Sequence, residues 1–211
     1  MDKIVFIVNP VAGGGRTKKL IPMIDKKMNE KKMDYRIILT NGPKEATTIA
    51  EKCLQEGYNK IVAVGGDGTV NEVALGVLNH GEGILGIVPS GTGNDLARTL
   101  NIPQEPEKAV DFLLSGKDKD IDIGIVNDQF FLNIASIGFD SEVAKTNERI
   151  KMKFKSGLSY IVSLFITLFK YDFIEAELEI DNFKTTCEIL LIAVGNGKYY
   201  SGGVKYYLWQ I

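Results

Sequence analysis

The sequence is poor in the side chains that dominate many active sites. Its 211 residues contain one histidine, His80, which lies in a glycine-flanked stretch and is predicted to be a surface turn residue. With one histidine, a multi-histidine metal site and nucleophile activation by any other histidine are both excluded. The two cysteines, Cys53 and Cys187, are far apart and lack metal-ligand spacing. We predict that both are buried free thiols in a reducing compartment.

The sequence also lacks a hydrophobic run long enough to cross a bilayer. The longest, residues 158–169, is shorter than the roughly 20 residues that a membrane-spanning helix needs. Met1 leads almost directly into a strand-like run without the features of a signal peptide, so we expect a cytoplasmic protein. The net charge of -2 and the absence of an arginine-rich patch argue against nucleic acid as a partner.

What the sequence does contain is a regular alternation of strand and helix patterns. The composition, 45% hydrophobic and 25% charged, is ordinary for a globular chain with a substantial core. Four apolar runs predict strands, and the first of them has the continuous apolar character of a strand buried on both faces. These runs are 3–9, 35–40, 60–64 and 84–88. The intervening patterns predict helices at 17–32, capped by Thr17, at 45–55, 70–78, 95–100 and 107–114. This order favours an open, mostly parallel sheet with helices on both faces.

The pattern changes after Ser115. Strand-like runs at 119–126 and 129–136 are joined by the turn pair Asn127-Asp128, and a second pair spans 173–180 and 185–195. Between these pairs, residues 141–149 and 157–170 are predicted to be helical. We therefore expect two domains, an α/β domain at 1–123 and an incomplete antiparallel β domain with inserted helices at 124–211.

The third predicted strand ends in a loop suited to phosphate. Gly65, Gly66 and Gly68 leave no Cβ between the backbone and a ligand, and a helix begins immediately after them. Asp67 would repel a phosphate unless a cation lay between the two. The simplest interpretation is a nucleotide whose phosphates contact the glycines while Asp67 holds Mg²⁺, directly or through water.

The other parallel strands end in similar residues. In an open α/β sheet, ligands bind beyond the carboxyl ends of the strands. Here these ends carry Asn9–Gly13, Thr40, Gly65–Thr69 and Pro89–Asn94. We expect all four segments to converge on one crevice.

With these motifs in hand, the chain resembles the diacylglycerol kinase catalytic-domain family, which includes bacterial soluble lipid kinases. The resemblance follows the chain from about residue 3 to 204 through a set of ordered motifs. These motifs are Asn9–Gly14, Gly65–Glu72, Pro89–Asp95, Asp122–Gly124, Asn133–Asp140, Val194–Gly197 and Tyr199–Gly203. The family's fold is an NAD kinase-like α/β domain followed by an antiparallel β-sandwich that meets the lipid.

The resemblance implies an ATP-dependent kinase of phospholipid biosynthesis, acting on diacylglycerol to form phosphatidic acid. ATP and a membrane lipid would be its partners, with transient contact at the inner face of the membrane, and a homodimer is left open. The implied catalytic residues are Asp67, Asp95 and Asp122, with Asp67 and Asp122 on Mg²⁺. The implied ATP-binding residues are Asn9, Pro10, Val11, Ala12, Gly13, Thr40, Gly65, Gly66, Asp67, Gly68, Thr69, Val70, Asn71, Glu72, Ser90, Thr92, Gly93 and Asn94.

Alternatives stay open for the substrate and for single residues. The acceptor could be a sphingoid base or NAD, or the chain could bind nucleotide without turnover. Asp67 could merely cap its own helix, and Asp95 could serve only the dipole of the helix that it begins. Asp122 alternates with Asp118 and Asp120, which is also the pattern of a solvated face. Thr92 and Asn94 could form a cap and a tight turn.

Two further features concern the second half. After a Gly-Gly like Gly202-Gly203 the family pattern continues to a late acidic general base, whereas here the residues from about Tyr206 look unlike the family and resemble the end of a truncated or frameshifted gene. Arg149, Lys151, Lys153 and Lys155 precede the apolar helix and suit an anionic membrane surface. For that helix itself, apolar almost all round, core packing is the preferred interpretation.

Overall fold

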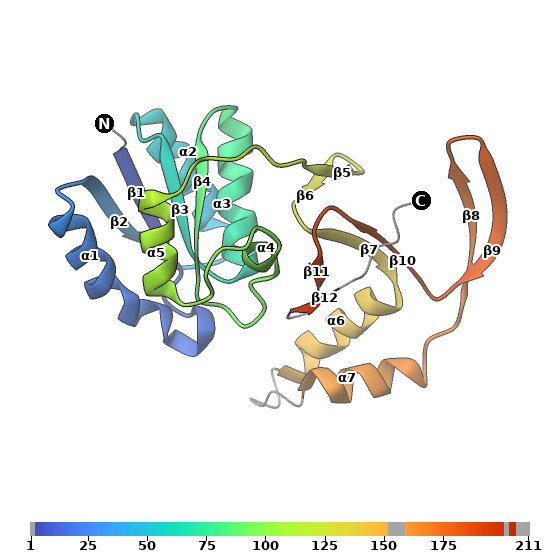
Figure 1. Cartoon of the computed structure of the whole chain (residues 1–211). Coiled ribbons are helices and arrows are strands. Elements are labelled where there is room, and N and C mark those ends of the chain that lie inside the picture. Colours follow the sequence, from blue (N-terminus) through green and yellow to red (C-terminus); the bar gives the residue numbers. More distant parts are fainter. Residues whose placement is uncertain (1–2, 152–158, 201–202, 206–211) are drawn as a thin grey trace. The chain divides into compact units, whose positions relative to one another are not determined.

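Four parallel strands form the sheet that organises the first half of the chain (Figure 1). The structure is a computed structural model, which describes residues 3–151, 159–200 and 203–205. The sheet has the strand order β2-β1-β3-β4 and every neighbouring pair is parallel, as the sequence predicted. Its strands are β1 (Lys3–Val8), β2 (Asp34–Leu39), β3 (Lys60–Gly65) and β4 (Ile84–Pro89).

Helices cover both faces of this sheet. One core cluster packs Val5 and Ile7 of β1 with residues of α2 (Glu45–Gln55) and α3 (Asp67–His80). The other packs Ile4, Phe6 and Val8 with residues of α1 (Ile21–Glu30) and α5 (Pro106–Ser115). Successive side chains of a strand point to opposite faces, so a strand covered on both sides must be apolar at every position. This requirement explains the continuous apolar run of β1.

The remaining described strands form antiparallel pairs. In the described part of the chain, four two-stranded pieces pair as β5–β6, β7–β10, β8–β9 and β11–β12. The strands are β5 (Gly124–Val126), β6 (Gln129–Phe131), β7 (Ile134–Gly138), β8 (Ile174–Ile180), β9 (Phe183–Ile189), β10 (Leu191–Gly195), β11 (Tyr199–Tyr200) and β12 (Val204–Lys205). The helices are the 3-10 turns η1 (Ala12–Gly15) and η2 (Thr17–Leu20), then α4 (Asp95–Thr99), α6 (Phe139–Lys151) and α7 (Ser159–Leu168). The predicted mixture of a parallel sheet and later antiparallel strands is confirmed.

The β5–β6 hairpin has the turn that its sequence predicts. Asn127 and Asp128 both have positive φ, 47° and 60°, as the two central residues of a type I′ turn require. Asn and Asp tolerate this conformation better than other side chains except glycine. The register Val126↔Gln129 leaves these two residues alone in the loop.

The described residues divide into two compact units. One contains those of Met1–Asn133 and Asn196–Ile211, and the other contains those of Ile134–Gly195. The second unit thus holds β7, α6, α7, β8, β9 and β10. The boundary after residue 123 was placed where the sequence pattern changes from parallel to antiparallel strands, and it stays a prediction. Among the described residues, no helix combines the length and the apolar character needed to cross a membrane.

Three local predictions need correction. Thr17 does not cap a helix through its side chain, and α1 begins only at Ile21, after the turn η2. The run 129–136 is interrupted at Leu132 and Asn133, where the Asn133 carbonyl oxygen accepts N–H groups from Asn196 and Gly197. The run 185–195 is interrupted at Leu190, whose carbonyl oxygen accepts the N–H of Phe139. The bonds Phe139–Leu190 and Asn196–Asn133 follow the antiparallel register of the β7–β10 pair just beyond its two ends.

Both cysteines are free, but only Cys53 is buried, while Cys187 is partly exposed. Burial raises the pKa of the Cys53 thiol above its usual value, which lowers the fraction of reactive thiolate at any given pH. We expect a thiol reagent such as DTNB to label Cys187 of the native protein rapidly and Cys53 slowly, and both after denaturation. A Cys187→Ser variant should lose the fast phase. Equal labelling rates at both positions would contradict the described burial.

Candidate functional site

The candidate site lies where the order of the sheet reverses. Strands β1 and β3 are neighbours, yet the helices that follow them, α1 and α3, pack on opposite faces. Such a switch point leaves a crevice beyond the carboxyl ends of the two strands. The side-chain amide of Asn9, which follows β1, donates to Thr69 Oγ1 at 3.1 Å, and Thr69 lies in the first turn of α3. The loops after β1 and β3 are therefore directly joined, as the sequence predicted.

Asp67 links the loop after β3 to the loop after β4. Its Oδ2 accepts the backbone N–H of Asn94 at 2.7 Å. Its Oδ1 accepts the N–H of Asp95 at 2.7 Å and that of Leu96 at 3.5 Å. These groups begin α4, whose N-cap residue Asn94 makes no side-chain cap of its own. Asp67 thus caps a helix that lies 28 residues further along the chain. The alternative considered from sequence was a cap on Asp67's own helix, but α3 has no such side-chain cap.

A third junction joins the loops after β1 and β4. Thr17 Oγ1 is hydrogen-bonded to Ser90 Oγ at 2.7 Å and to the carbonyl oxygen of Ala12 at 3.0 Å. Thr17 is fully buried, which explains why its hydroxyl contacts a distant loop instead of capping the nearby helix. Gly13 lies on the same junction, because a Cβ at this position would overlap the Ser90 carbonyl oxygen.

The glycines of these loops have two different functions in the structure. Gly66 and Gly91 pack backbone against backbone, and a Cβ on Gly91 would overlap the Cα of Gly66. A Cβ on Gly65 would overlap the side chain of Thr69. Gly68, in the first turn of α3, has no atom within 4 Å of a Cβ built on it. Packing therefore explains Gly65 and Gly66, whereas Gly68 borders open space.

The other predicted ATP-binding residues are distributed around these junctions. Asn94, with φ of 54°, holds a tight turn through side-chain bonds to the N–H and carbonyl oxygen of Gly91. The carbonyl oxygen of Gly93 accepts Arg98 Nε at 3.0 Å. Val11, Asn71 and Thr92 are exposed. Pro10 and Ala12 are partly exposed.

Three predicted residues are engaged in the packing of the α/β domain. Thr40 is buried, and its N–H extends the β1–β2 ladder to Val8 at 2.9 Å. Val70 is a core residue. The carboxylate of Glu72 accepts the N–H of Ala46, at the start of α2, at 3.3 Å. The acidic end of Glu72 thus stabilises the N-terminus of a neighbouring helix.

The two other predicted acids have different surroundings. Asp95 begins α4, and its Oδ1 accepts the N–H of Gly203 at 2.7 Å. An aspartate that only stabilised the dipole of α4 would not need this contact. Asp122 is exposed, and its backbone oxygen accepts Asn196 Nδ2 at 2.7 Å. The described residues include no group of three or more histidine, cysteine or acidic side chains able to hold a metal.

Two asparagines extend the network beyond the predicted residues. Asn133 accepts a hydrogen bond from Thr99 of α4 at 3.1 Å, and its carbonyl oxygen accepts the N–H groups of Asn196 and Gly197. The side chain of Asn196 donates to the carbonyl oxygens of Asp122 and Leu132. Asn133 and Asn196 both lie in motifs of the family resemblance. The local sequence does not reveal that the segments containing these two asparagines pair with each other beside α4.

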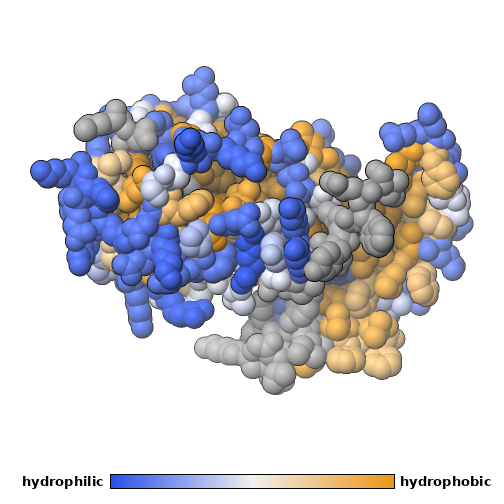
Figure 2. Space-filling view, in the orientation of Figure 1, coloured by the Kyte–Doolittle hydropathy of each residue, from blue (hydrophilic) through white to orange (hydrophobic). Residues whose placement is uncertain are grey.

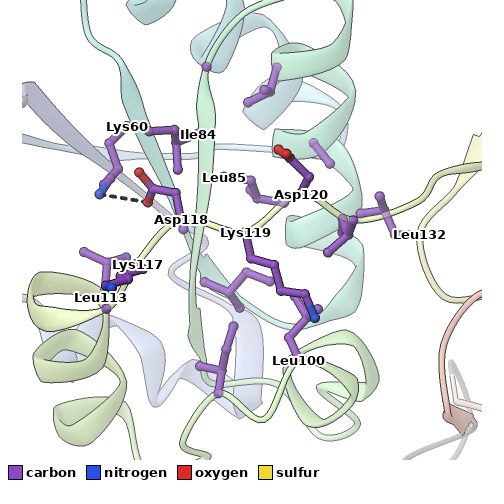
Figure 3. A pocket seen from close by; sticks show the side chains of 18 of the residues that line it. Lys60, Ile84, Leu85, Leu100, Leu113, Lys117, Asp118, Lys119, Asp120 and Leu132 are labelled. Carbon is purple, nitrogen blue, oxygen red and sulfur yellow. Dashed lines mark ion pairs between the residues drawn. The ribbon is translucent and has the colours of Figure 1, made fainter.

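A groove of 460 Å³ beside β4 is separate from these loops (Figure 3). None of residues 65–72 or 89–94 lines it. Lys60 Nζ and Asp118 Oδ1 are 3.4 Å apart in the groove, among leucines and isoleucines from β4, α5, the residues just after α4 and the segment 116–123. Asp118 thus forms an ion pair with Lys60 at the start of β3, as one expects of an acidic residue whose function is to stabilise the fold.

The fold and these junctions define an α/β protein with a site built from loops at the carboxyl ends of parallel strands. The model of the diacylglycerol kinase catalytic domain matches residues 3–126. The chain therefore belongs to the diacylglycerol kinase catalytic-domain family, as its motifs had indicated.

Individual relatives agree with this assignment. The chain is 32% identical over 192 residues to a protein of Staphylococcus carnosus named diacylglycerol kinase, covering 90% of this chain. It is 33% identical over 204 residues to a probable lipid kinase YegS-like of Pseudomonas aeruginosa, covering 96% of this chain. A crystal structure of a putative diacylglycerol kinase from Bacillus anthracis matches with a TM-score of 0.80 at 29% identity, over 98% of this chain and 68% of that one. The chain spans 62% and 66% of the lengths of the two curated relatives.

The junction between Gly13 and Ser90 yields a direct test of the loop packing. Gly13 and Gly14 have φ of 58° and 70°, so alanine is strained at both, but only at Gly13 does a Cβ meet another atom. We expect Gly14→Ala to lower the free energy of unfolding by about 1 kcal/mol, and Gly13→Ala to lower it by about 1–3 kcal/mol more. Urea unfolding of the two variants measures the difference. Equal losses would show that the loops after β1 and β4 do not pack as described.

Proposed function

We propose that the protein is an ATP-dependent lipid kinase that transfers the γ-phosphate of ATP to the hydroxyl of diacylglycerol, forming phosphatidic acid. The observation that carries this proposal is the joining of three glycine-containing loops at the switch point of the sheet, in a member of this family. Phosphoryl transfer depends mainly on positioning and charge neutralisation, which such a rigid loop cluster favours. The protein would act from the cytoplasm at the inner face of the membrane.

The start of α3 is the best candidate for the phosphates. This helix has 14 residues, and its first N–H groups lack partners within the helix. Gly68 in its first turn borders open space, so a phosphate oxygen could approach the backbone there. Gly14, in the loop after β1, is equally unobstructed. These positions support a nucleotide that lies across the loops after β1 and β3.

The surroundings of Asp67 favour an indirect contact with Mg²⁺. A carboxylate offers about four lone-pair sites, and the Asp67 carboxylate already accepts three backbone N–H groups. Asp67 therefore fits a cation held through water better than one bound directly, and Asp122 would be the second acid. When bound, Mg²⁺ would supply positive charge to the transferring phosphoryl group. Asp95 would complete the acidic set and keep the segment at Gly203 in place.

The acceptor is inferred from the relatives. Their names refer to diacylglycerol kinase and lipid kinase, which favours a lipid alcohol. A sphingoid base and NAD are the other acceptors to compare. The three candidates differ enough that one transfer assay with competing acceptors separates them.

Asp67→Asn tests the proposed reaction. The amide keeps one acceptor oxygen but turns an N–H₂ donor toward backbone N–H groups, so we expect α4 to lose part of its cap and the free energy of unfolding to fall by about 1–3 kcal/mol. Under conditions where the variant is folded, transfer from [γ-³²P]ATP to diacylglycerol should be lost. Asp120→Asn, an exposed acid beside the β4 groove, is the control and should retain transfer.

The same assay offers the parent chain diacylglycerol, sphingosine and NAD in competition. Undiminished transfer by the Asp67→Asn variant would overturn the proposed function of this acid. Nucleotide binding by the parent without transfer to any acceptor would favour a nucleotide-binding protein without turnover.

Gly68→Ala separates ligand binding from folding. Gly68 has no positive φ and no neighbour near a new Cβ, so alanine should stabilise the first turn of α3 by about 0.5–1 kcal/mol. If phosphate contacts the backbone at this position, the same methyl group should weaken ATP binding by about tenfold or more. Calorimetry of ATP binding and thermal unfolding of the same sample measure both effects. Unchanged ATP affinity would place the phosphates elsewhere.

A further inference from the structure

In the described part of helix α7 (Ser159–Leu168), two polar side chains are buried, while apolar side chains on the opposite face are exposed. Ser163 and Thr167, one turn apart, are 0% and 5% exposed. Thr167 Oγ1 is hydrogen-bonded to Thr146 Oγ1 of α6 at 3.2 Å. The opposite face carries Val162, Phe165, Ile166 and Phe169, the i, i+3, i+4, i+7 spacing of a single stripe, and all four are exposed. Core packing, the preferred interpretation from sequence, is therefore wrong for this stripe.

The exposure is large for aromatic side chains. Phe165 is 53% exposed and Phe169 is 85% exposed, and Leu168 between them is also exposed. Figure 2 shows hydrophobic side chains gathered over this helix. A contiguous apolar surface of this kind marks a contact with another apolar body, because isolated exposure of one side chain is common but a whole stripe is not.

The charges beside the stripe distinguish between partners. Arg149 at the end of α6 and Lys170 just after α7 are exposed, and the sequence from 149 to 171 contains five basic residues and no acidic one. Of these five, Lys153 and Lys155 lie outside the described residues. The first acidic residue after this stretch of the sequence is Asp172. A second copy of the chain docked symmetrically on this stripe would bring like charges together. An anionic lipid surface would meet them with the opposite charge.

We propose that α7 is a membrane-docking helix whose outer stripe, Val162, Phe165, Ile166 and Phe169, inserts among the acyl chains of an anionic bilayer. Thr167, which shares the buried face with Ser163, holds the helix on α6 through its bond to Thr146, while the apolar face enters the lipid. Arg149 and Lys170 contact the headgroups. This inference extends the proposed lipid kinase to its membrane partner, but it depends on the second unit alone.

The hairpin β8–β9 supplies a matched control. Phe183 in this hairpin is 63% exposed, comparable with Phe165, but β8 carries Glu175, Glu177 and Glu179, all exposed. Acidic side chains disfavour an anionic surface, so the hairpin should not take part in docking. Phe183→Ser thus removes an equally exposed aromatic ring from the same unit outside the proposed contact.

The test is sedimentation of the full chain with vesicles of phosphatidylcholine, with and without phosphatidylglycerol, in the absence of ATP. Phe165→Ser and Phe169→Ser should each weaken binding to the phosphatidylglycerol vesicles by about tenfold, and Phe183→Ser should not. Lys170→Glu should weaken binding only when phosphatidylglycerol is present. Because no nucleotide is used, the outcome is independent of the proposed kinase reaction.

Three results would overturn the proposal. One is the absence of vesicle binding by the parent chain. Another is an equal loss for Phe183→Ser and Phe165→Ser. The last is a parent dimer that Phe165→Ser converts to a monomer, with vesicle binding unchanged, which would assign the stripe to a second copy. Circular dichroism of each variant verifies that the fold is retained.

Discussion

The contact between the Asp67 carboxylate and the first N–H groups of α4 determines much of the candidate site. A helix of five residues has too few internal hydrogen bonds to be stable by itself, so its start must be fixed from outside. Asp67 does this from the end of β3. The position of α4 in turn places Asp95 against Gly203 and Thr99 against Asn133. The carboxylates of Asp67 and Asp95 therefore connect the parallel sheet with Gly203, which lies 108 residues after Asp95 in the sequence.

This contact also changes how an acid among glycines should be interpreted. From sequence alone, the carboxylate of Asp67 beside a phosphate-binding loop requires a cation, because nothing else in the local sequence offsets the negative charge of the carboxylate. In the structure, backbone N–H groups already offset part of that charge. Gly65, Gly66 and Gly13 similarly have packing reasons to be glycine. A function in ligand binding is thus not needed to explain every residue of the motif, and Gly68 becomes the most informative of them.

The sequence predicted the features that depend on local pattern. The parallel sheet followed from β1 and β3, which are apolar at nearly every position because both faces are covered, and the hairpin turn followed from Asn127 and Asp128. Pairings between distant side chains could not be predicted this way. Thr17 was expected to cap the adjacent helix but contacts Ser90, and Glu72 contacts the start of α2. Both side chains can form hydrogen bonds near their own position in the sequence. Only the folded structure determines which distant partner comes within hydrogen-bonding distance.

Helix α7 shows a different limit of periodicity. A helix that is apolar almost all round was assigned to a core because its apolar residues did not select a face. The two buried polar side chains, Ser163 and Thr167, determine which face of the helix points inward. Thr167 is buried against the hydroxyl of Thr146 in α6, and Ser163, one turn earlier, is buried on the same face, so the phenylalanines of the helix point away from the unit. In water this arrangement exposes apolar surface and gains only weak polar contacts, whereas against lipid the same surface is removed from water. The orientation of α7 is thus the one expected of a helix whose outer environment is apolar.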